Sequence, residues 1–308
     1  MARALKAGAV LLLLACTAPE AMPVKQTTTT DDSRVAAIGP RAGLPTALAR
    51  ALDPAAFVPL AAPGPNDWLA SHPEPGQTFQ QFERAGANRP DAQRHTIYLQ
   101  PLGAFGPDAP SLELLRKYAA AFFMLEVKLL TPVPLDASMT SRSNPYSGQR
   151  QLLTSDVLSV LRRKLPSDAY CIVGITMTDL YPDPSWNFVF GQASLTERVG
   201  IYSFARYGGG SKELTLRRSC KVLTHESGHM FGLAHCIWFR CIMNGSNHLA
   251  EADARPMHLC PVDLRKLQWS VGFDVVERYR RLRDVCREAH FDDEARRLEG
   301  ELARIGRP

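Results

Sequence analysis

The run from His225 to His235 constrains this chain more than any other stretch. It reads H-E-S-G-H-M-F-G-L-A-H, so two histidines lie four positions apart and a third follows a glycine. Residues four apart on an α-helix stand on the same face, so His225 and His229 can hold one metal ion between them. Gly232 can end the helix and turn the chain back at little cost, which brings His235 to the same place.

Three imidazoles with a fourth position left open form the ligand set of a catalytic zinc site. Glu226 lies beside the first histidine and cannot reach the metal in the same way, so it is placed to take a proton from the water that zinc activates. The pattern H-E-x-x-H-x-x-G-x-x-H therefore predicts zinc-dependent hydrolysis. An amphipathic helix with surface histidines is the plain alternative, but it leaves the coincidence of the glycine and the glutamate unexplained.

Cysteines that could bind a second metal begin at the next residue. Cys236, Cys241 and Cys260 lie within 25 residues, and this density is typical of a structural zinc site with thiolate ligands. Disulfide pairing is the alternative, because the chain has an even number of cysteines apart from Cys16 and an oxidising compartment would favour pairing. The cysteines concerned are Cys171, Cys220, Cys236, Cys241, Cys260 and Cys286. Composition leaves both readings open.

The amino-terminal residues have the pattern of a secretion signal. Arg3 and Lys6 precede the apolar run 7–15, which is too short to span a bilayer as a helix. The run ends in Leu-Leu-Ala-Cys at 13–16, which resembles a bacterial lipobox, and a plain signal peptide with an incidental cysteine is the alternative. We expect residues 1–16 to be a signal peptide with Cys16 lipidated, and hence a membrane-anchored protein of the bacterial cell envelope. Thr17 supplies no acidic retention signal, so the outer membrane is the expected address.

Composition divides the rest of the chain into a linker and one domain. Residues 17–56 are rich in Ala, Pro and Thr and lack apolar periodicity apart from a short helix pattern at 44–52, so a flexible linker is expected. Residues 57–308 are enough for one domain with a substantial core. The net charge of +5 comes from 36 basic and 31 acidic residues mixed along the chain. No basic block is interleaved with aromatic residues, which excludes a nucleic-acid partner.

Strand and helix patterns alternate before the histidine motif, and helical patterns dominate after it. Strands are predicted at 95–100, 124–130, 170–176, 187–190 and 199–204, and helices at 112–121 and 152–165. The motif helix should run over about 214–231, and residues from 274 onward should form one or two amphipathic helices. These patterns predict an α/β or α+β domain, with a twisted mixed sheet backed by helices and a mainly helical carboxy-terminal part.

From about residue 57 to 285 the chain resembles the archaemetzincins, a branch of the metzincin zinc metallopeptidases. Residues 225–260 carry the family's zinc motif followed by C-x4-C, a methionine two positions later, and the first cysteine of a distal C-x-x-C. The segments 95–103, 169–183 and 199–207 also look like family segments. The resemblance implies a metzincin-like fold in which Met243 forms an apolar floor beneath the metal.

The resemblance also implies roles for the individual site residues. His225, His229 and His235 would bind the catalytic zinc with Glu226 as general base. A second, structural zinc would be bound by Cys236, Cys241 and Cys260. The chain departs from the family at Asp263, which stands where the last cysteine of the distal pair is expected. A carboxylate can bind zinc, so Asp263 is expected to complete the second site.

The activity implied is hydrolysis of small peptides, with aminopeptidase-like action as one form of it. The alternative is a non-catalytic envelope lipoprotein in which zinc stabilises a peptide-binding surface. Glu226 argues against that alternative, because a binding protein needs no base at this position. In the polar loop that follows Met243, Asp253 and Arg255 are expected to pair with each other.

Overall fold

The computed structural model describes residues 11–15 and 29–306, except residues 87, 136, 195, 196 and 209. The predicted lipidation site at Cys16 and the first part of the predicted linker, 17–28, lie outside the described residues. No helix in the described part of the chain is both long enough and apolar enough to cross a membrane.

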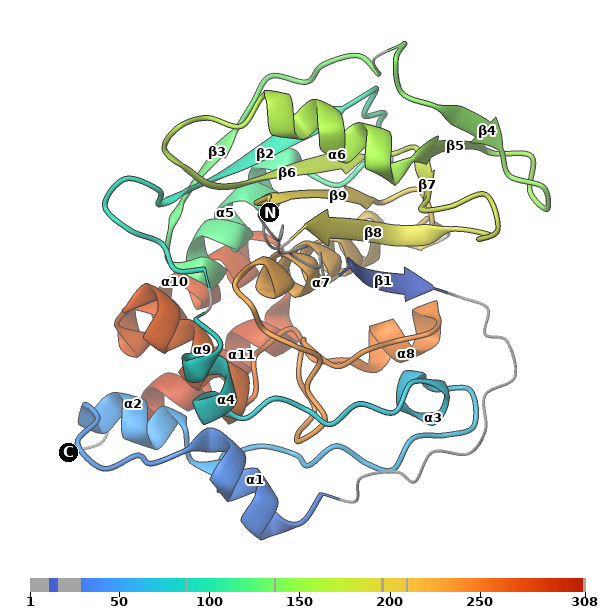
Figure 1. The fold of residues 1–308 in the computed structure, drawn as a ribbon. Helices are drawn as coiled ribbons and strands as arrows, with labels where there is room; N and C mark the ends of the chain where they lie inside the picture. Colours follow the sequence, from blue (N-terminus) through green and yellow to red (C-terminus); the bar gives the residue numbers. More distant parts are fainter. Residues whose placement is uncertain are drawn as a thin grey trace, which may run out of the picture.

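A mixed sheet of nine strands crosses the domain in the order β3-β2-β6-β9-β8-β7-β5-β4, with β1 paired to β8 off this path (Figure 1). Neighbours from β3 to β9 are parallel, whereas β8 is antiparallel to both β9 and β1. The strands are β1 (Leu11–Ala15), β2 (Thr96–Leu102), β3 (Glu126–Leu129), β4 (Ser141–Ser143), β5 (Arg150–Leu153), β6 (Ala169–Thr176), β7 (Asp179–Tyr181), β8 (Val189–Ser194) and β9 (Val199–Ser203).

Helices cover both faces of this sheet (Figure 1). In the view of Figure 1, α6 lies above the sheet, and α5 and α7 lie below it with the carboxy-terminal helices. The helices are α1 (Asp31–Ile38), α2 (Thr46–Ala51), η1 (Pro54–Ala56), α3 (Trp68–Ser71), α4 (Phe79–Arg84), α5 (Leu112–Phe123), α6 (Thr154–Arg163), α7 (Lys212–Met230), α8 (Leu249–Ala254), α9 (Pro261–Val271), α10 (Val275–Glu288) and α11 (Asp292–Ile305). The predicted α/β architecture with a mainly helical carboxy-terminal part is confirmed.

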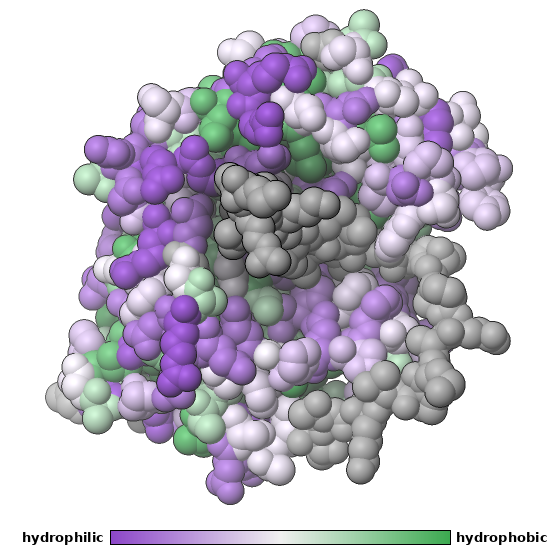
Figure 2. Space-filling view, viewed as in Figure 1, coloured by the Kyte–Doolittle hydropathy of each residue, from purple (hydrophilic) through white to green (hydrophobic). Residues whose placement is uncertain are grey.

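The two faces of the sheet pack into two hydrophobic clusters. Successive residues of a strand point to opposite faces, so Ile172 of β6 joins the cluster beneath α6 while Val173 joins the larger cluster around α5 and α7. Every residue of β6 is buried, as expected for a parallel strand covered on both sides. Large apolar side chains are exposed among the described residues only at Val35, Val58 and Tyr146. The surface in Figure 2 is accordingly mostly hydrophilic, with apolar residues scattered in small patches.

The predicted elements around the sheet are largely confirmed, with boundaries displaced by a few residues. The strand predicted at 187–190 runs instead over Val189–Ser194, and residues 191–194 are Gly, Gln, Ala and Ser, which hide the apolar alternation. Four strands were not predicted. Strands β4, β5 and β7 have three or four residues, too few to show a period, and β1 lies in the apolar run that was predicted as the core of a signal peptide.

Residues 29–56 differ from the predicted flexible linker. Thr30 caps α1 through a capping box, and the helix buries Ile38 in the larger core cluster. The helix pattern predicted at 44–52 is present as α2, which buries Leu48 against the same core and packs beside α10 and α11. Each helix offers only two or three core side chains, so neither shows a clear apolar stripe in the sequence. Residues 29–56 therefore pack as part of the domain, which was predicted to begin at residue 57.

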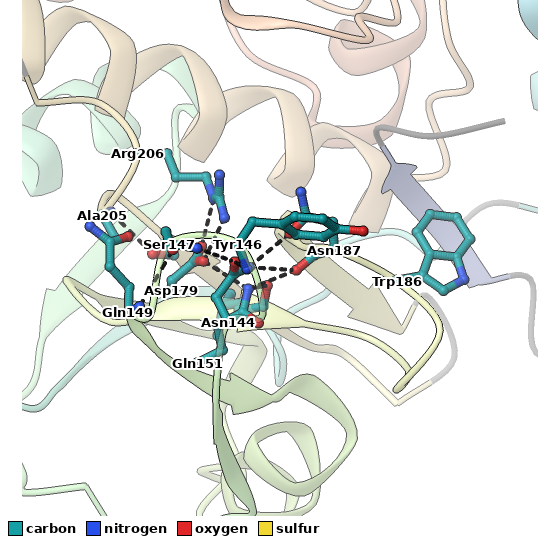
Figure 3. A network of polar contacts seen from close by, with 12 residues as sticks. Asn144, Tyr146, Ser147, Gln149, Gln151, Asp179, Trp186, Asn187, Ala205 and Arg206 are labelled. Atoms are coloured by element: carbon teal, nitrogen blue, oxygen red, sulfur yellow. Dashed lines mark hydrogen bonds and ion pairs between the residues drawn. The ribbon is translucent and has the colours of Figure 1, made fainter.

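A buried polar network fixes one end of the sheet against the entry to α7 (Figure 3). Asp179 of β7 is 2% exposed, and its two oxygens accept from Arg206 Nε at 2.8 Å and Nη2 at 2.7 Å. Gln151 of β5 donates to Asp179 Oδ2 and to the Asn187 carbonyl, both at 2.8 Å. Asn144 donates to Asn187 Oδ1 at 2.8 Å. The network thus joins β5, β7, the loop that precedes β8, and the loop that leads into the motif helix.

Candidate metal centre

Helix α7 carries the first half of the histidine motif to the centre of the domain. Ser211 caps its amino terminus by accepting from Leu214 N at 3.1 Å, and the helix packs beneath β8 and β9. It ends at Met230, because Gly232 has a φ of +84° and turns the chain back. The expectation that Gly232 brings the third histidine round is met in the fold.

The structure brings the three predicted histidines together. The ring centroids of His225, His229 and His235 lie 4.7, 5.3 and 4.9 Å apart pairwise, and all three side chains are buried. One ring nitrogen from each lies within 4.8 Å of the others. The Nε2 atoms of His225 and His229 are 3.2 Å apart.

Hydrogen bonds on the far side of each ring decide which nitrogen faces the centre. Nδ1 of His225 lies 2.7 Å from the Ile242 carbonyl, and Nδ1 of His229 lies 2.6 Å from the Leu233 carbonyl. A carbonyl oxygen only accepts, so each Nδ1 carries the proton and each Nε2 presents a lone pair to the centre. Arg255 Nη1, which donates to the Asn244 carbonyl at 2.6 Å, also lies 3.0 Å from His225 Nδ1.

This arrangement fits a zinc ion. His235 Nε2 is buried without a hydrogen-bond partner among the described residues. Burial lowers the pKa of His229 to about 3 and that of His225 well below its usual value, so both rings are neutral. Neutral imidazole nitrogens that converge without a proton between them are the donors that zinc takes.

Glu226, which follows His225 on α7, is a buried carboxyl group. It is 2% exposed, and its Oε1 has no hydrogen-bond partner in the described part of the chain. Burial raises the pKa of Glu226 to about 8, although the nearby Arg255 guanidinium opposes the shift. A carboxyl group whose pKa lies near neutrality can both take up and release a proton.

Met243 packs directly against the motif helix, as the predicted floor of the site. A Cβ built on Gly228 would lie 2.7 Å from the Met243 sulfur, so the absence of a side chain at Gly228 makes room for it. The Met243 carbonyl accepts from Cys236 N at 2.8 Å, which links the floor to the loop of the third histidine. Met243 is fully buried.

The second predicted group, Cys236, Cys241, Cys260 and Asp263, also comes together. Their ligand atoms lie within 4.8 Å of one another and all four residues are buried. Cys236 Sγ and Cys260 Sγ are 3.5 Å apart, and Asp263 Oδ2 lies 3.3 Å from Cys241 Sγ. All six cysteines that the structure describes are free thiols, so the disulfide alternative is not realised here.

The donor set of this second group favours a bound cation. Burial raises the pKa of Cys241 and Cys260 well above the usual thiol value, and it raises that of Asp263 to about 6. Lys266 brings a positive charge to these four groups, because its Nζ lies 2.8 Å from Asp263 Oδ1 at 1% side-chain exposure. A central zinc ion would supply the charge that three thiolates and a carboxylate need in a buried site.

Two residues in contact with these groups were not predicted. Glu74 lies 2.7 Å from His235 Nδ1, and Lys266 contacts Asp263. The predicted pairing of Asp253 with Arg255 is wrong. Asp253 instead binds Arg218 at 2.6 Å, and Arg255 is buried behind His225. Only Lys266 carries a local signal, because its spacing of three from Asp263 on α9 places the two on one helix face.

Comparisons with known proteins show what this chain is similar to. The model of peptidase family M54 matches residues 149–269, a range that contains both metal-binding groups. Archaemetzincin-2 of Macaca fascicularis is 46% identical over 264 residues, covering 73% of this chain and 73% of that protein. Human archaemetzincin-1 is 37% identical over 255 residues, covering 70% of this chain and 51% of that protein. The crystal structure of archaemetzincin from Methanopyrus kandleri is 30% identical and covers 59% of this chain and 97% of that chain, with a TM-score of 0.48.

Proposed function

Because the chain belongs to the archaemetzincin family of zinc metallopeptidases, we propose that it cleaves peptide bonds at the site formed by His225, His229 and His235. One observation carries the proposal. Three buried histidines bring one ring nitrogen each to within 4.8 Å of the others, and the next residue after His225 is Glu226, a buried acid with an oxygen that has no hydrogen-bond partner among the described residues. A site with these donors and this neighbouring acid has the parts that metal-assisted hydrolysis requires.

Zinc held there supplies a Lewis acid that polarises the scissile carbonyl and makes a water molecule more acidic. Glu226 accepts the proton that the attacking water gives up, and it returns that proton to the leaving nitrogen. His225 and His229 are held in place by their Nδ1 hydrogen bonds to backbone carbonyls, so neither ring has to reorient during the reaction. Burial of the acid supports this role, because it brings the pKa of Glu226 to about 8.

Replacing Glu226 by Gln tests the base. The variant should retain its zinc and lose turnover by at least ~10²-fold, the usual scale of acid–base contributions. Glu213→Gln is the matched control, since Glu213 is an exposed carboxylate in the first turn of the same helix. The control should cleave peptides at the parental rate. A Glu226→Gln enzyme as fast as the control would refute the assignment.

Small peptides are the proposed substrates, with aminopeptidase-like action. The resemblance to the archaemetzincins supports this part of the proposal. Peptides with a free amino terminus should be trimmed one residue at a time, whereas acetylated copies should resist. Equal cleavage of both sets at internal bonds would show an endopeptidase.

We place a second, structural zinc at Cys236, Cys241, Cys260 and Asp263. A carboxylate is a harder ligand than a thiolate, so this ion should be easier to remove by chelators than one bound by four thiolates. Asp263→Cys should therefore tighten it and Asp263→Ala should loosen it, as measured by zinc release to a chelator. A Cys236–Cys241 disulfide in protein from its native compartment would show that the group holds no metal there.

The lipid anchor at Cys16 remains a proposal, together with the outer-membrane address. The apolar run that ends in Leu-Leu-Ala-Cys supports it. Parental protein should partition into detergent and carry an acyl group on Cys16, and Cys16→Ser should remain unprocessed or become soluble with its domain intact. Recovery of the parental protein in the aqueous phase, with Cys16 unmodified, would contradict the anchor.

A further inference from the structure

Residues 68–77, far upstream of the histidine motif, pack against the loop that carries His235. Glu74, between α3 and α4, lies with its Oε1 2.7 Å from His235 Nδ1. The same oxygen accepts from Trp68 Nε1 at 2.9 Å. Two donors on one oxygen fix the orientation of the carboxylate, and the carboxylate in turn fixes the plane and the tautomer of the imidazole.

His235 differs from the other two histidines in the partner of its Nδ1. His225 and His229 each contact a neutral backbone carbonyl, whereas His235 contacts a carboxylate. A carboxylate draws the Nδ1 proton more strongly than a carbonyl does, which makes the opposite nitrogen a better electron donor. His235 also lies on a loop beyond the end of α7, so it has no helix to hold its ring in place.

The environment of Glu74 holds it in place from several sides. The indole ring of Trp68 packs directly against Gly245. A Cβ added at Gly245 would lie 2.2 Å from the indole, so only glycine leaves room for the ring. The indole stacks on His72 at 3.9 Å and meets the His235 ring edge-on at 5.2 Å. Gln77 of the same segment donates to the Gly232 carbonyl and accepts from Ala234 N, both at 3.2 Å.

We propose that Glu74 is a positioning residue for the metal site, and that residues 68–77 hold the third ligand of that site, His235, in its orientation. This inference rests on the proposed function, because it assumes that the histidines bind zinc. Glu74 does not touch the reacting atoms. It acts through His235, by holding Nε2 toward the centre and by increasing its strength as a donor.

Glu74→Gln removes the negative charge of the side chain and keeps its shape. The glutamine oxygen can still accept from His235 and Trp68, and the side chain of Glu74 is 23% exposed, so the new amide group has a route to solvent. Losing a carboxylate partner of a metal-bound histidine typically weakens metal affinity by about 10–100-fold. We therefore expect Glu74→Gln to bind Zn²⁺ about tenfold or more weakly than the parent, with unchanged unfolding of the metal-free protein.

The experiment titrates metal-free full-length protein with Zn²⁺ against a competing chelator and repeats the titration with Co²⁺. Cobalt separates the two groups, since only the cysteine group gives thiolate-to-metal charge-transfer absorption. Glu83→Gln is the matched control, because Glu83 is an exposed carboxylate nine positions further along. The control should bind metal like the parent, and excess zinc should restore the turnover of Glu74→Gln.

The outcomes separate the two proposals. A parent that binds no metal at the histidines refutes the proposed function itself. A parent that binds zinc there, together with a Glu74→Gln variant of equal affinity and equal cobalt spectrum, refutes only the role of Glu74. Weaker binding accompanied by a less stable metal-free protein would assign Glu74 a structural role, which also overturns the proposal.

Discussion

Gly228→Ala tests how closely the motif helix packs on the methionine floor. Gly228 lies inside α7, where alanine is favoured over glycine by about 1 kcal/mol because it restricts the unfolded chain. The new methyl carbon would lie 2.7 Å from Met243 Sδ and 3.2 Å from its Cε, well inside ordinary contact. Overpacking of this kind costs about 1–3 kcal/mol. The two effects oppose each other, and the overlap should cancel or exceed the helix gain.

Gly300→Ala is the control that measures the stabilisation gained when alanine replaces glycine in a helix without any overlap. Gly300 lies in the interior of α11, and an added Cβ would meet nothing within 4 Å. We expect Gly300→Ala to stabilise the protein by about 1 kcal/mol, and Gly228→Ala to be less favourable than this control by about 1–3 kcal/mol. Urea unfolding of metal-free protein gives both values without a contribution from zinc binding.

A double variant identifies the source of the penalty. Met243→Ala should cost about 2–5 kcal/mol by leaving a cavity, and in that background Gly228→Ala should become stabilising. The reasoning is wrong if Gly228→Ala stabilises the parent as much as Gly300→Ala does. It is also wrong if the penalty at Gly228 persists unchanged after Met243 is truncated.

Two further predictions concern charges remote from the metal groups. Asp179→Asn should lower the free energy of unfolding by about 3 kcal/mol. This is the low end for breaking a buried ion pair, because Arg206 keeps 26% of its side chain exposed. A loss under about 1 kcal/mol, measured by urea unfolding, would contradict this. Burial alone would raise the pKa of Glu294, but Arg297 and His258 outweigh it and hold that pKa far below the usual glutamate value. Glu294 therefore stabilises the fold above pH 4.5 and loses this contribution as the pH falls. In Glu294→Gln the free energy of unfolding should fall less steeply at acid pH than in the parent. An equally steep fall in both proteins would refute the prediction.

The histidine motif could be predicted because its geometry is local. A spacing of four on one helix and a glycine turn are enough to place His225, His229 and His235, whatever the rest of the fold does. The strands β2, β6 and β9 were also predictable, since each has at least five residues and is rich in β-branched, aromatic and other apolar side chains.

Contacts between distant parts of the chain could not be predicted in this way. Glu74 and His235 are separated by 161 positions, and a lone glutamate in an irregular segment carries no signal of its partner. Asp253 was predicted to pair with its neighbour Arg255, but it pairs with Arg218 on α7 instead. Helices α1 and α2 were missed as part of the domain because tertiary packing, and not an apolar stripe, holds them.

Anomalous diffraction on either side of the zinc absorption edge tests the central claim most directly. Crystals of protein purified without added metal or chelator should show a peak bounded by the Nε2 atoms of His225, His229 and His235. A second peak is expected among the cysteines and Asp263. Protein that cleaves peptides but shows no anomalous density between the three histidines would contradict the assignment of the catalytic site.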